Sequence, residues 1–272
     1  KSFEKLFEQY NIKNVVFSPP CTKFREPEKS SWMYYIQRKL LMNYFGNFLS
    51  ALISRSFYND KEELRNFWKF FSNKQSLIKI LNPDNKLLFS KIQNYENFKM
   101  WYWINPKVDN ISDVSNEIKK FSRKIYGIKF HQYWHSFKTE DLNEYIKLAD
   151  NKNLPVYIIL TYTNKKEILK IIKNYNNVKF IFGYGGFPMF NSIWNDINVN
   201  KNCYIDLASN HIDREIIKKI VNLVDTKKIL FASDCPYNFK NKENDFDYNL
   251  FLRGFSKIDD ISKNQILSND LK

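Results

Sequence analysis

The sequence predicts an α/β fold, specifically a (β/α)8 TIM barrel, on three observations. Short apolar runs rich in β-branched and aromatic residues recur along the chain, and segments with the helical spacing of apolar residues lie between them. From Met100 onward, strand and helix alternate at intervals of roughly 25 residues, which is typical of βα units in a parallel sheet. Seven strands are recognisable, one fewer than a closed eight-stranded barrel needs.

The expected strands are too short, and too rich in β-branched or aromatic residues, to be amphipathic helices. They are residues 14–18, 100–104, 127–131, 156–161, 179–184, 203–208 and 229–233. Because closure requires one more strand, we expect it in a segment upstream of Lys1. A barrel that closes without such a segment would contradict this prediction.

Residues 20–98 lie between the first two expected strands and are too many for one crossover. They include several helical segments dense in Trp, Tyr and Phe. We therefore expect a single domain, residues 1–272, with residues 20–98 as a helical insertion. An insertion after a barrel strand leaves from the face that carries active sites, so it would cap the barrel or provide the surface of a homodimer.

The composition excludes several classes of protein. The formal net charge of +14 comes mainly from Lys residues spread along expected helix faces, so we interpret it as a solvated surface and expect no nucleic-acid partner. The most apolar window, residues 32–54, contains Arg38 and Lys39, so we expect no membrane span. Three cysteines without metal-ligand spacing, and no segment typical of a signal peptide, favour a cytoplasmic location.

The run 229–236 predicts a buried strand that ends in a carboxylate. Apolar side chains extend to Phe231, small ones follow, and Pro236 prevents further ladder pairing, so Asp234 should lie at the carboxyl end of the strand. In a parallel barrel that end is the active face. Asp234 is therefore a candidate general base, and the alternative is a strand-end residue that accepts backbone N–H bonds.

Lys129 and His131 alternate with Phe130, so both face the barrel interior if Phe130 packs outward against helices. A lysine inside a barrel needs an anionic partner, which Asp234 or an acidic substrate can provide; the alternative is an internal ion pair. His131 is a candidate hydrogen-bonding residue of the site. His135 follows four residues later and is either a substrate-binding residue at the same mouth or a solvated loop residue.

Seven segments, in order along the chain, resemble the amidohydrolase-related proteins, the aminocarboxymuconate-semialdehyde decarboxylase-like branch of the amidohydrolase superfamily. The eighth-strand signature Phe-Gly-Ser-Asp-x-Pro of that family is similar to Phe231–Pro236. The other matching segments are 3–19, 103–106, 127–131 with its Gly-x-Lys-x-His pattern, 154–156, 178–186 and 203–206. The family's first strand, which carries a His-x-His pair, would lie just upstream of Lys1.

The resemblance implies a divalent metal ion, usually zinc, bound by that His-x-His pair, a His on strand five, a His on strand six and the Asp on strand eight. Here Tyr184 stands at the strand-six position, and the strand-five position falls on Ile159 or Leu160. Of the ligands that the sequence should contain, only Asp234 remains. Since an apolar side chain cannot ligate and a neutral phenol is a poor substitute for imidazole, we expect the metal site to be degenerate.

Three further residues are candidates for contact with a substrate. Tyr184 would place a phenol in the pocket, where it donates to a substrate oxyanion or fills the space vacated by a metal. Trp103 ends the expected third strand of the family. His211 follows the seventh strand and either reaches the site or belongs to the start of the next helix.

These residues predict an amidohydrolase-like hydrolase of a small anionic carboxylate, lactone or ester, without a metal or with an atypical metal site. Asp234 is the expected general base, and Lys129, His131 and Tyr184 are the expected binders of an oxyanion or carboxylate. One alternative is an inactive barrel retained for binding or assembly. Another is a metal-dependent hydrolase or decarboxylase, if an upstream His-x-His pair completes the site with Asp234 as a ligand.

Overall fold

The computed structural model describes residues 12–19, 22–23, 79–80, 82–135, 137–161, 165–187, 189–208, 212, 214–234 and 255–269. Most of the expected insertion, residues 20–98, lies outside the described residues, and so does His211. The insertion, the homodimer and the cytoplasmic location therefore stay predictions. No helix in the described part of the chain combines the length and the hydropathy that crossing a membrane requires.

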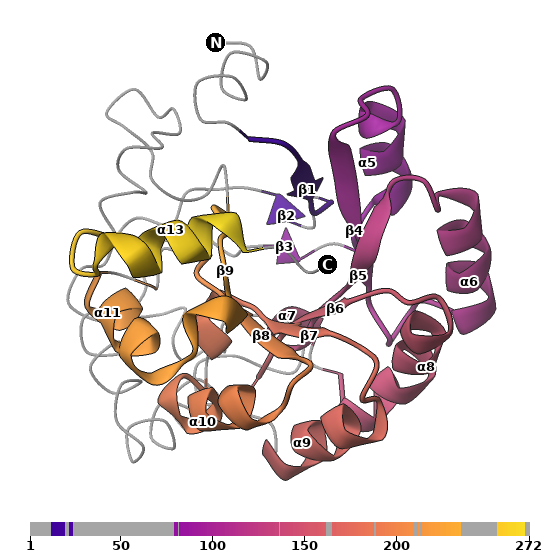
Figure 1. Cartoon of the computed structure of the whole chain (residues 1–272). Coiled ribbons are helices and arrows are strands. Elements are labelled where there is room, and N and C mark those ends of the chain that lie inside the picture. Colours follow the sequence, from indigo (N-terminus) through magenta and orange to yellow (C-terminus); the bar gives the residue numbers. More distant parts are fainter. Residues whose placement is uncertain are drawn as a thin grey trace, which may run out of the picture.

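Seven parallel strands form one curled sheet in the order β1-β4-β5-β6-β7-β8-β9 (Figure 1). A separate antiparallel pair joins Thr22–Lys23 (β2) to Lys79–Ile80 (β3). The seven strands are Val15–Phe17 (β1), Phe98–Ile104 (β4), Ile125–His131 (β5), Val156–Ile159 (β6), Phe180–Phe182 (β7), Cys203–Asp206 (β8) and Ile229–Leu230 (β9). Each expected strand is thereby confirmed, with shifted bounds.

Helices follow the strands and cover the outer side of the curl (Figure 1). The longer ones are Asn85–Ile92 (α5), Ile111–Lys120 (α6), Asn143–Asn151 (α8), Lys165–Asn174 (α9), Asn191–Val199 (α10), Arg214–Leu223 (α11) and Asp260–Ser268 (α13). Short turns of helix are Gln132–His135 (α7), Thr139–Leu142 (η1), Tyr184–Gly186 (η2) and Thr226–Lys228 (η3). The alternation of parallel strands and helices is that of a partial (β/α)8 TIM barrel, so the predicted fold class is confirmed.

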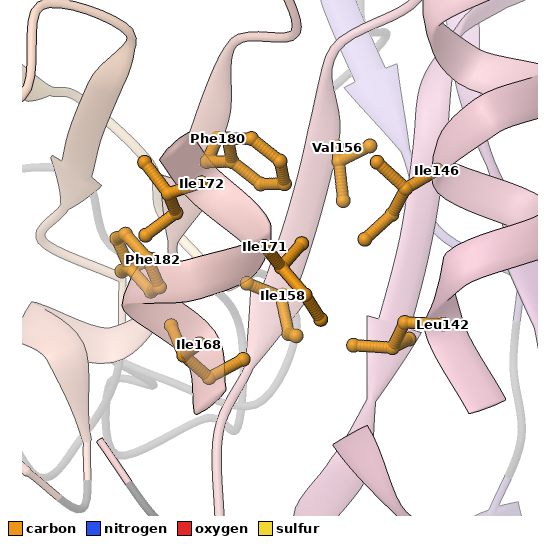
Figure 2. Close-up of a pocket in the computed structure, with 9 residues that line it drawn as sticks. All are labelled: Leu142, Ile146, Val156, Ile158, Ile168, Ile171, Ile172, Phe180 and Phe182. Carbon is orange, nitrogen blue, oxygen red and sulfur yellow. The ribbon is translucent and has the colours of Figure 1, made fainter. Parts of the chain in front are cut away.

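Side chains of the strands alternate between two environments. Those that point outward, such as Ile158 and Phe182, pack against apolar residues of the helices and of η1 (Figure 2). A small gap remains in this layer, and it is lined only by Leu, Ile, Val and Phe, with no group that binds or reacts. Those that point inward form a second cluster around Tyr157, Ile159 and Ile181. The site is therefore built on the inner face.

Two expected strands end earlier than their sequence patterns suggest. β7 stops at Phe182 because Tyr184 has a positive φ of 57° and opens the turn η2. β9 stops at Leu230, so Asp234 lies four residues beyond the ladder rather than at its last position, and its own φ is 49°. Non-glycine residues rarely adopt this left-handed conformation, which costs of order 1–3 kcal/mol and concentrates at functional sites.

Candidate active site

Lys129 lies on the inner face of β5, and its side chain is buried. Its Nζ donates a hydrogen bond to Ser18 Oγ at 2.9 Å, just beyond the end of β1. The same nitrogen lies 4.4 Å from the centre of the Trp103 ring and 5.1 Å from that of the Tyr157 ring. The ammonium group is thus held between two aromatic faces, an arrangement that stabilises a partly desolvated cation.

Asp206, the last residue of β8, is the best-bonded carboxylate of the site, and it is only 2% exposed. It accepts hydrogen bonds from Tyr157 Oη at 2.7 Å, from the backbone N–H of Tyr184 at 2.8 Å and from that of Ala208 at 3.1 Å. Burial raises the pKa of Asp206 to about 6, although these bonds and the nearby Lys129 lower it. Sequence reasoning missed both Asp206 and Tyr157.

Tyr184 connects the two carboxylates of the site. Its backbone N–H donates to Asp206, while its phenol donates a long hydrogen bond of 3.4 Å to Asp234 Oδ1. The backbone bond holds Tyr184 in its left-handed conformation, and Gly185 and Gly186 continue the turn with φ values of 65° and 78°. The structure therefore brings Tyr184 and Asp234 together.

Asp234 is partly buried at the carboxyl end of β9. Burial and, to a smaller extent, the charge of Asp206 raise the pKa of its carboxyl group, Lys129 and the Tyr184 phenol lower it, and the net result is a pKa of about 6. A carboxylate with a pKa near 6 is ionised at neutral pH and is a stronger base than an ordinary aspartate. Asp234 is thus suited to accept a proton.

Gly183, directly after β7, makes room for Tyr157. A Cβ at this position would lie 2.5 Å from Tyr157 Oη and 2.8 Å from its Cζ, far inside van der Waals contact. Any larger residue would displace the phenol that donates to Asp206. Gly183 is therefore part of the packing that positions this carboxylate.

Trp103, at the end of β4, lies at the centre of an aromatic cluster with residues of β5 and α7. Its ring centre is 5.7 Å from that of His131, 5.8 Å from that of Trp134 and 5.9 Å from that of His135. The buried Asn85 fixes its backbone: Asn85 Nδ2 donates to the Trp103 carbonyl at 2.8 Å, and the Trp103 N–H donates to Asn85 Oδ1 at 2.9 Å. Trp103 is thus rigidly positioned.

Both histidines of the cluster are buried and neutral. The backbone N–H of Trp134 donates to His131 Nδ1 at 3.1 Å, and the Trp134 ring stacks on the imidazole at 4.0 Å. Burial, with a contribution from Lys129, lowers the pKa of His131 well below 6.5. Burial also lowers the pKa of His135 to about 4, with a smaller effect of Lys107. The alternative that His135 is a solvated loop residue is wrong, because it is only 7% exposed.

The described residues do not fit the divalent metal ion that the family resemblance implies. They contain no group of three or more His, Cys, Asp and Glu side chains arranged to hold a metal. Of the two strand-five alternatives, Ile159 is fully buried on the inner face and Leu160 is buried on the helix side. The strand-six position is Tyr184, which donates to Asp234. Neither position therefore supplies a histidine ligand for a metal ion.

Comparison with known proteins agrees with the resemblance. The model of the Amidohydro_2 family, described as amidohydrolase, matches residues 100–269. A search of curated proteins found no match.

Several solved structures share the fold at low sequence identity. A "probable 2-pyrone-4,6-dicarboxylic acid hydrolase" from Acinetobacter baumannii, with citric acid bound, superposes with a TM-score of 0.51 and 15% identity over 70% of this chain and 77% of that one. A Pseudomonas putida protein described as a "putative" hydrolase of the same acid superposes with a TM-score of 0.53 and 9% identity over 68% of this chain and 74% of that one. A Burkholderia multivorans amidohydrolase with bound zinc superposes with a TM-score of 0.50 and 8% identity over 67% of this chain and 75% of that one. At these identities the likeness shows the fold.

Proposed function

Since this chain belongs to the amidohydrolase family, we propose that it hydrolyses a small anionic substrate, a lactone or ester that carries a carboxylate, with Asp234 as its general base. The observation that carries the proposal is the position of Asp234. Its carboxyl group has a pKa raised to about 6, beside the phenol of Tyr184 and within the field of Lys129. Base, hydrogen-bond donor and cation thus meet at the carboxyl ends of the strands.

In the proposed reaction, Asp234 accepts a proton from a water molecule as the water oxygen attacks the carbonyl carbon of the substrate. The carbonyl π-electrons move to oxygen. Once Asp234 is protonated, the single O–H of Tyr184 turns from Asp234 to the resulting oxyanion, which the positive charge of Lys129 also stabilises. When the tetrahedral intermediate collapses, the C–O bond to the leaving group breaks, and the proton on Asp234 passes to the leaving alkoxide. An activated carbonyl, as in a lactone, suits this mechanism.

Asp206 supports this reaction as a positioning residue. It bonds the backbone of Tyr184 and the phenol of Tyr157, and so fixes the turn from which the Tyr184 side chain reaches Asp234. Its charge also helps to raise the pKa of Asp234.

A second candidate function is a barrel that binds small anions without turnover. It is favoured by Tyr184 and by the Ile159 or Leu160 position, where the family resemblance expects metal-ligating histidines. The same cation and aromatic faces would then serve binding alone. A hydrolase requires the Asp234 carboxylate as its base, whereas a binding barrel does not.

The deciding experiment is Asp234→Asn, assayed against a panel of small lactones and aryl esters that carry a carboxylate. We expect kcat/KM to fall on the order of 10³-fold, as for removal of a general base, with an unchanged circular dichroism spectrum. Asp113→Asn, an exposed carboxylate in the first turn of α6, is the control and should stay within about twofold. A folded Asp234→Asn protein with full turnover, or a wild-type protein that hydrolyses none of the panel, favours the binding barrel.

Metal content is measured on the same preparations by plasma mass spectrometry, with protein made without chelator and with its natural N-terminus. Activity that is independent of bound metal supports the proposal. Near one zinc or manganese ion per chain, with activity that follows the metal, would instead favour a metal-dependent hydrolase or decarboxylase.

A further inference from the structure

Unsatisfied polar atoms gather at one place in the structure. Among the described residues, six buried side-chain nitrogen and oxygen atoms have no hydrogen-bond partner, and four of them belong to Trp103, His131 and His135. These three side chains are 3%, 2% and 7% exposed. A buried polar group without a partner costs about 1–3 kcal/mol, so folded proteins seldom concentrate several in one cluster unless something else bonds to them.

The three residues are close enough to contact one small group. The ring centre of Trp103 lies within 5.9 Å of those of both histidines, and Lys129 Nζ lies 4.4 Å from the same indole. All four residues stand at the carboxyl ends of β4 and β5 or in α7, which follows β5 (Figure 1). The cluster therefore belongs to the face of the barrel that carries active sites.

The unsatisfied atoms are mostly donors. The indole of Trp103 has only an N–H to offer. His131 Nδ1 accepts from the Trp134 backbone, so the proton of this neutral imidazole is on Nε2, which is the atom without a partner. His135 is neutral as well and supplies one donor and one acceptor, and neither is bonded. The three side chains thus offer three N–H donors and one acceptor, and a lysine cation lies beside them.

We propose that Trp103, His131 and His135 form a carboxylate-binding subsite that, next to Lys129, holds the non-reacting carboxylate of the substrate. A carboxylate is the small group that accepts several hydrogen bonds, donates none and carries the charge that complements Lys129. The inference rests on the proposed function, because only a hydrolase has a substrate. The carboxylate-binding subsite itself is defined by binding alone. It assigns these donors to recognition and leaves Asp234 and Tyr184 to the reaction. Lys129 lies beside Trp103 and also acts on Asp234, so its charge serves both the bound carboxylate and the oxyanion.

The subsite adjoins the reaction centre. The ring of His131 lies 6.4 Å from that of Tyr184, whose phenol donates to Asp234. The two rings make an edge contact, so a carboxylate bound at the subsite places the rest of a small substrate beside Tyr184 and Asp234.

Benzoate is the probe, titrated into the full-length protein and followed by tryptophan fluorescence, with uncharged benzyl alcohol as the neutral comparison. We expect Trp103→Phe, which keeps an aromatic ring and removes the N–H, to raise the Kd for benzoate at least tenfold and to leave benzyl alcohol binding unchanged. Trp101→Phe is the matched control, because Trp101 lies on the same strand and packs against Tyr126 and Tyr157 instead. It should stay within twofold.

A second measurement does not depend on the folding of a variant. In ¹⁵N-labelled wild-type protein, the indole N–H resonance assigned to Trp103 should shift on addition of benzoate, while that of Trp101 should not. No benzoate binding to wild-type protein, no shift at Trp103, or equal affinity in Trp103→Phe would overturn the subsite, and these outcomes are what buried water alone would produce. Inorganic phosphate that competes as strongly as benzoate would overturn the assignment to a carboxylate.

The outcomes separate this inference from the proposed function. Binding of benzoate that depends on Trp103 and persists in Asp234→Asn supports the subsite even if no ester or lactone is hydrolysed. Hydrolysis that depends on Asp234, without any effect of Trp103→Phe on benzoate affinity, would remove the subsite and keep the hydrolase.

Discussion

The two faces of strand β5 differ sharply although their residues alternate along one strand. On the outer face, Phe130 is fully buried and makes edge contacts with the rings of Phe137 and Tyr145. On the inner face, Lys129 and His131 are equally hidden from water but are polar. The same contrast recurs on β6 between Ile158 and Tyr157, which belong to different apolar clusters. The period of two in a strand makes this separation possible.

The difference shows how the fold separates stability from chemistry. The outer face consists of apolar side chains against helices, which is the arrangement that stabilises a (β/α)8 barrel. The inner face collects what is unfavourable in isolation: a buried cation, carboxyl groups of raised pKa and unpaired N–H groups. Two of the four described non-glycine residues with a positive φ, Tyr184 and Asp234, lie at the same place. Unfavourable features that concentrate on one face indicate a functional site.

The largest expected effect tests the outer face. Phe130→Ala should lower the free energy of unfolding by about 3–5 kcal/mol, because it leaves a cavity between β5 and the helix layer. The measurement is urea unfolding followed by circular dichroism. Ile128→Val, a smaller truncation on the same face of the same strand, should cost about 0.5–1.5 kcal/mol. If both variants lower the free energy of unfolding by the same small amount, the outer face is not the stabilising layer that we describe.

Lys129→Met tests the inner face one residue away. The side-chain volume and the apolar stem are nearly kept, but the cation that we assign to the oxyanion is lost. We expect the free energy of unfolding to stay within about 1 kcal/mol, since a desolvated charge is removed together with its hydrogen bond to Ser18. Activity against the lactone panel should fall by about 10²-fold.

Lys147→Met, an exposed lysine of α8, is the control for Lys129→Met and should change neither stability nor activity. Loss of stability in Lys129→Met with full activity per folded molecule would reverse the assignment and make Lys129 a structural residue, as in the internal ion pair that the sequence left open.

The sequence predicted the fold well because the fold depends on a repeated pattern. All seven strands, and the helices α6, α8, α9 and α11, follow from apolar periodicity, which the outer face imposes on these elements. The helix α10 had no such prediction. The inward direction of Lys129 and His131 followed from the same period of two. Strand ends were predicted less well, since the turn at Tyr184 depends on a hydrogen bond to Asp206, a residue distant in sequence.

The site was predicted only in part, for a physical reason. Asp206 ends a short apolar strand just as Asp234 does, and that pattern was the available signal for it. Its hydrogen bond with Tyr157 joins β6 to β8 and needs the space left by a glycine at position 183. No local pattern in the sequence therefore reveals it. The unpaired atoms of Trp103 and His135 likewise appear only once the strands are assembled.

The pH dependence of stability compares the inner-face carboxylates with the inner-face histidines. The pKa of Asp206 is raised from 3.8 to about 6 on folding, so between these values the folded state binds more protons than the unfolded state. Its contribution to the free energy of unfolding is therefore greatest below about pH 4 and is lost as the pH rises through 6, on the order of 2 kcal/mol. His131 and His135, whose pKa values are lowered, act in the opposite direction over this range.

Because these contributions oppose each other, the informative quantity is the difference between wild type and Asp206→Asn, measured by urea unfolding at pH 4, 5, 6 and 7. The substitution removes the ionisable group and also weakens the bonds to Tyr157 and Tyr184, which lowers stability at every pH. The loss should be largest at pH 4, where wild-type Asp206 is mostly protonated, and should shrink toward pH 7, where the wild type holds a buried carboxylate. A loss that is constant with pH would mean that Asp206 titrates normally and that its role is confined to its hydrogen bonds.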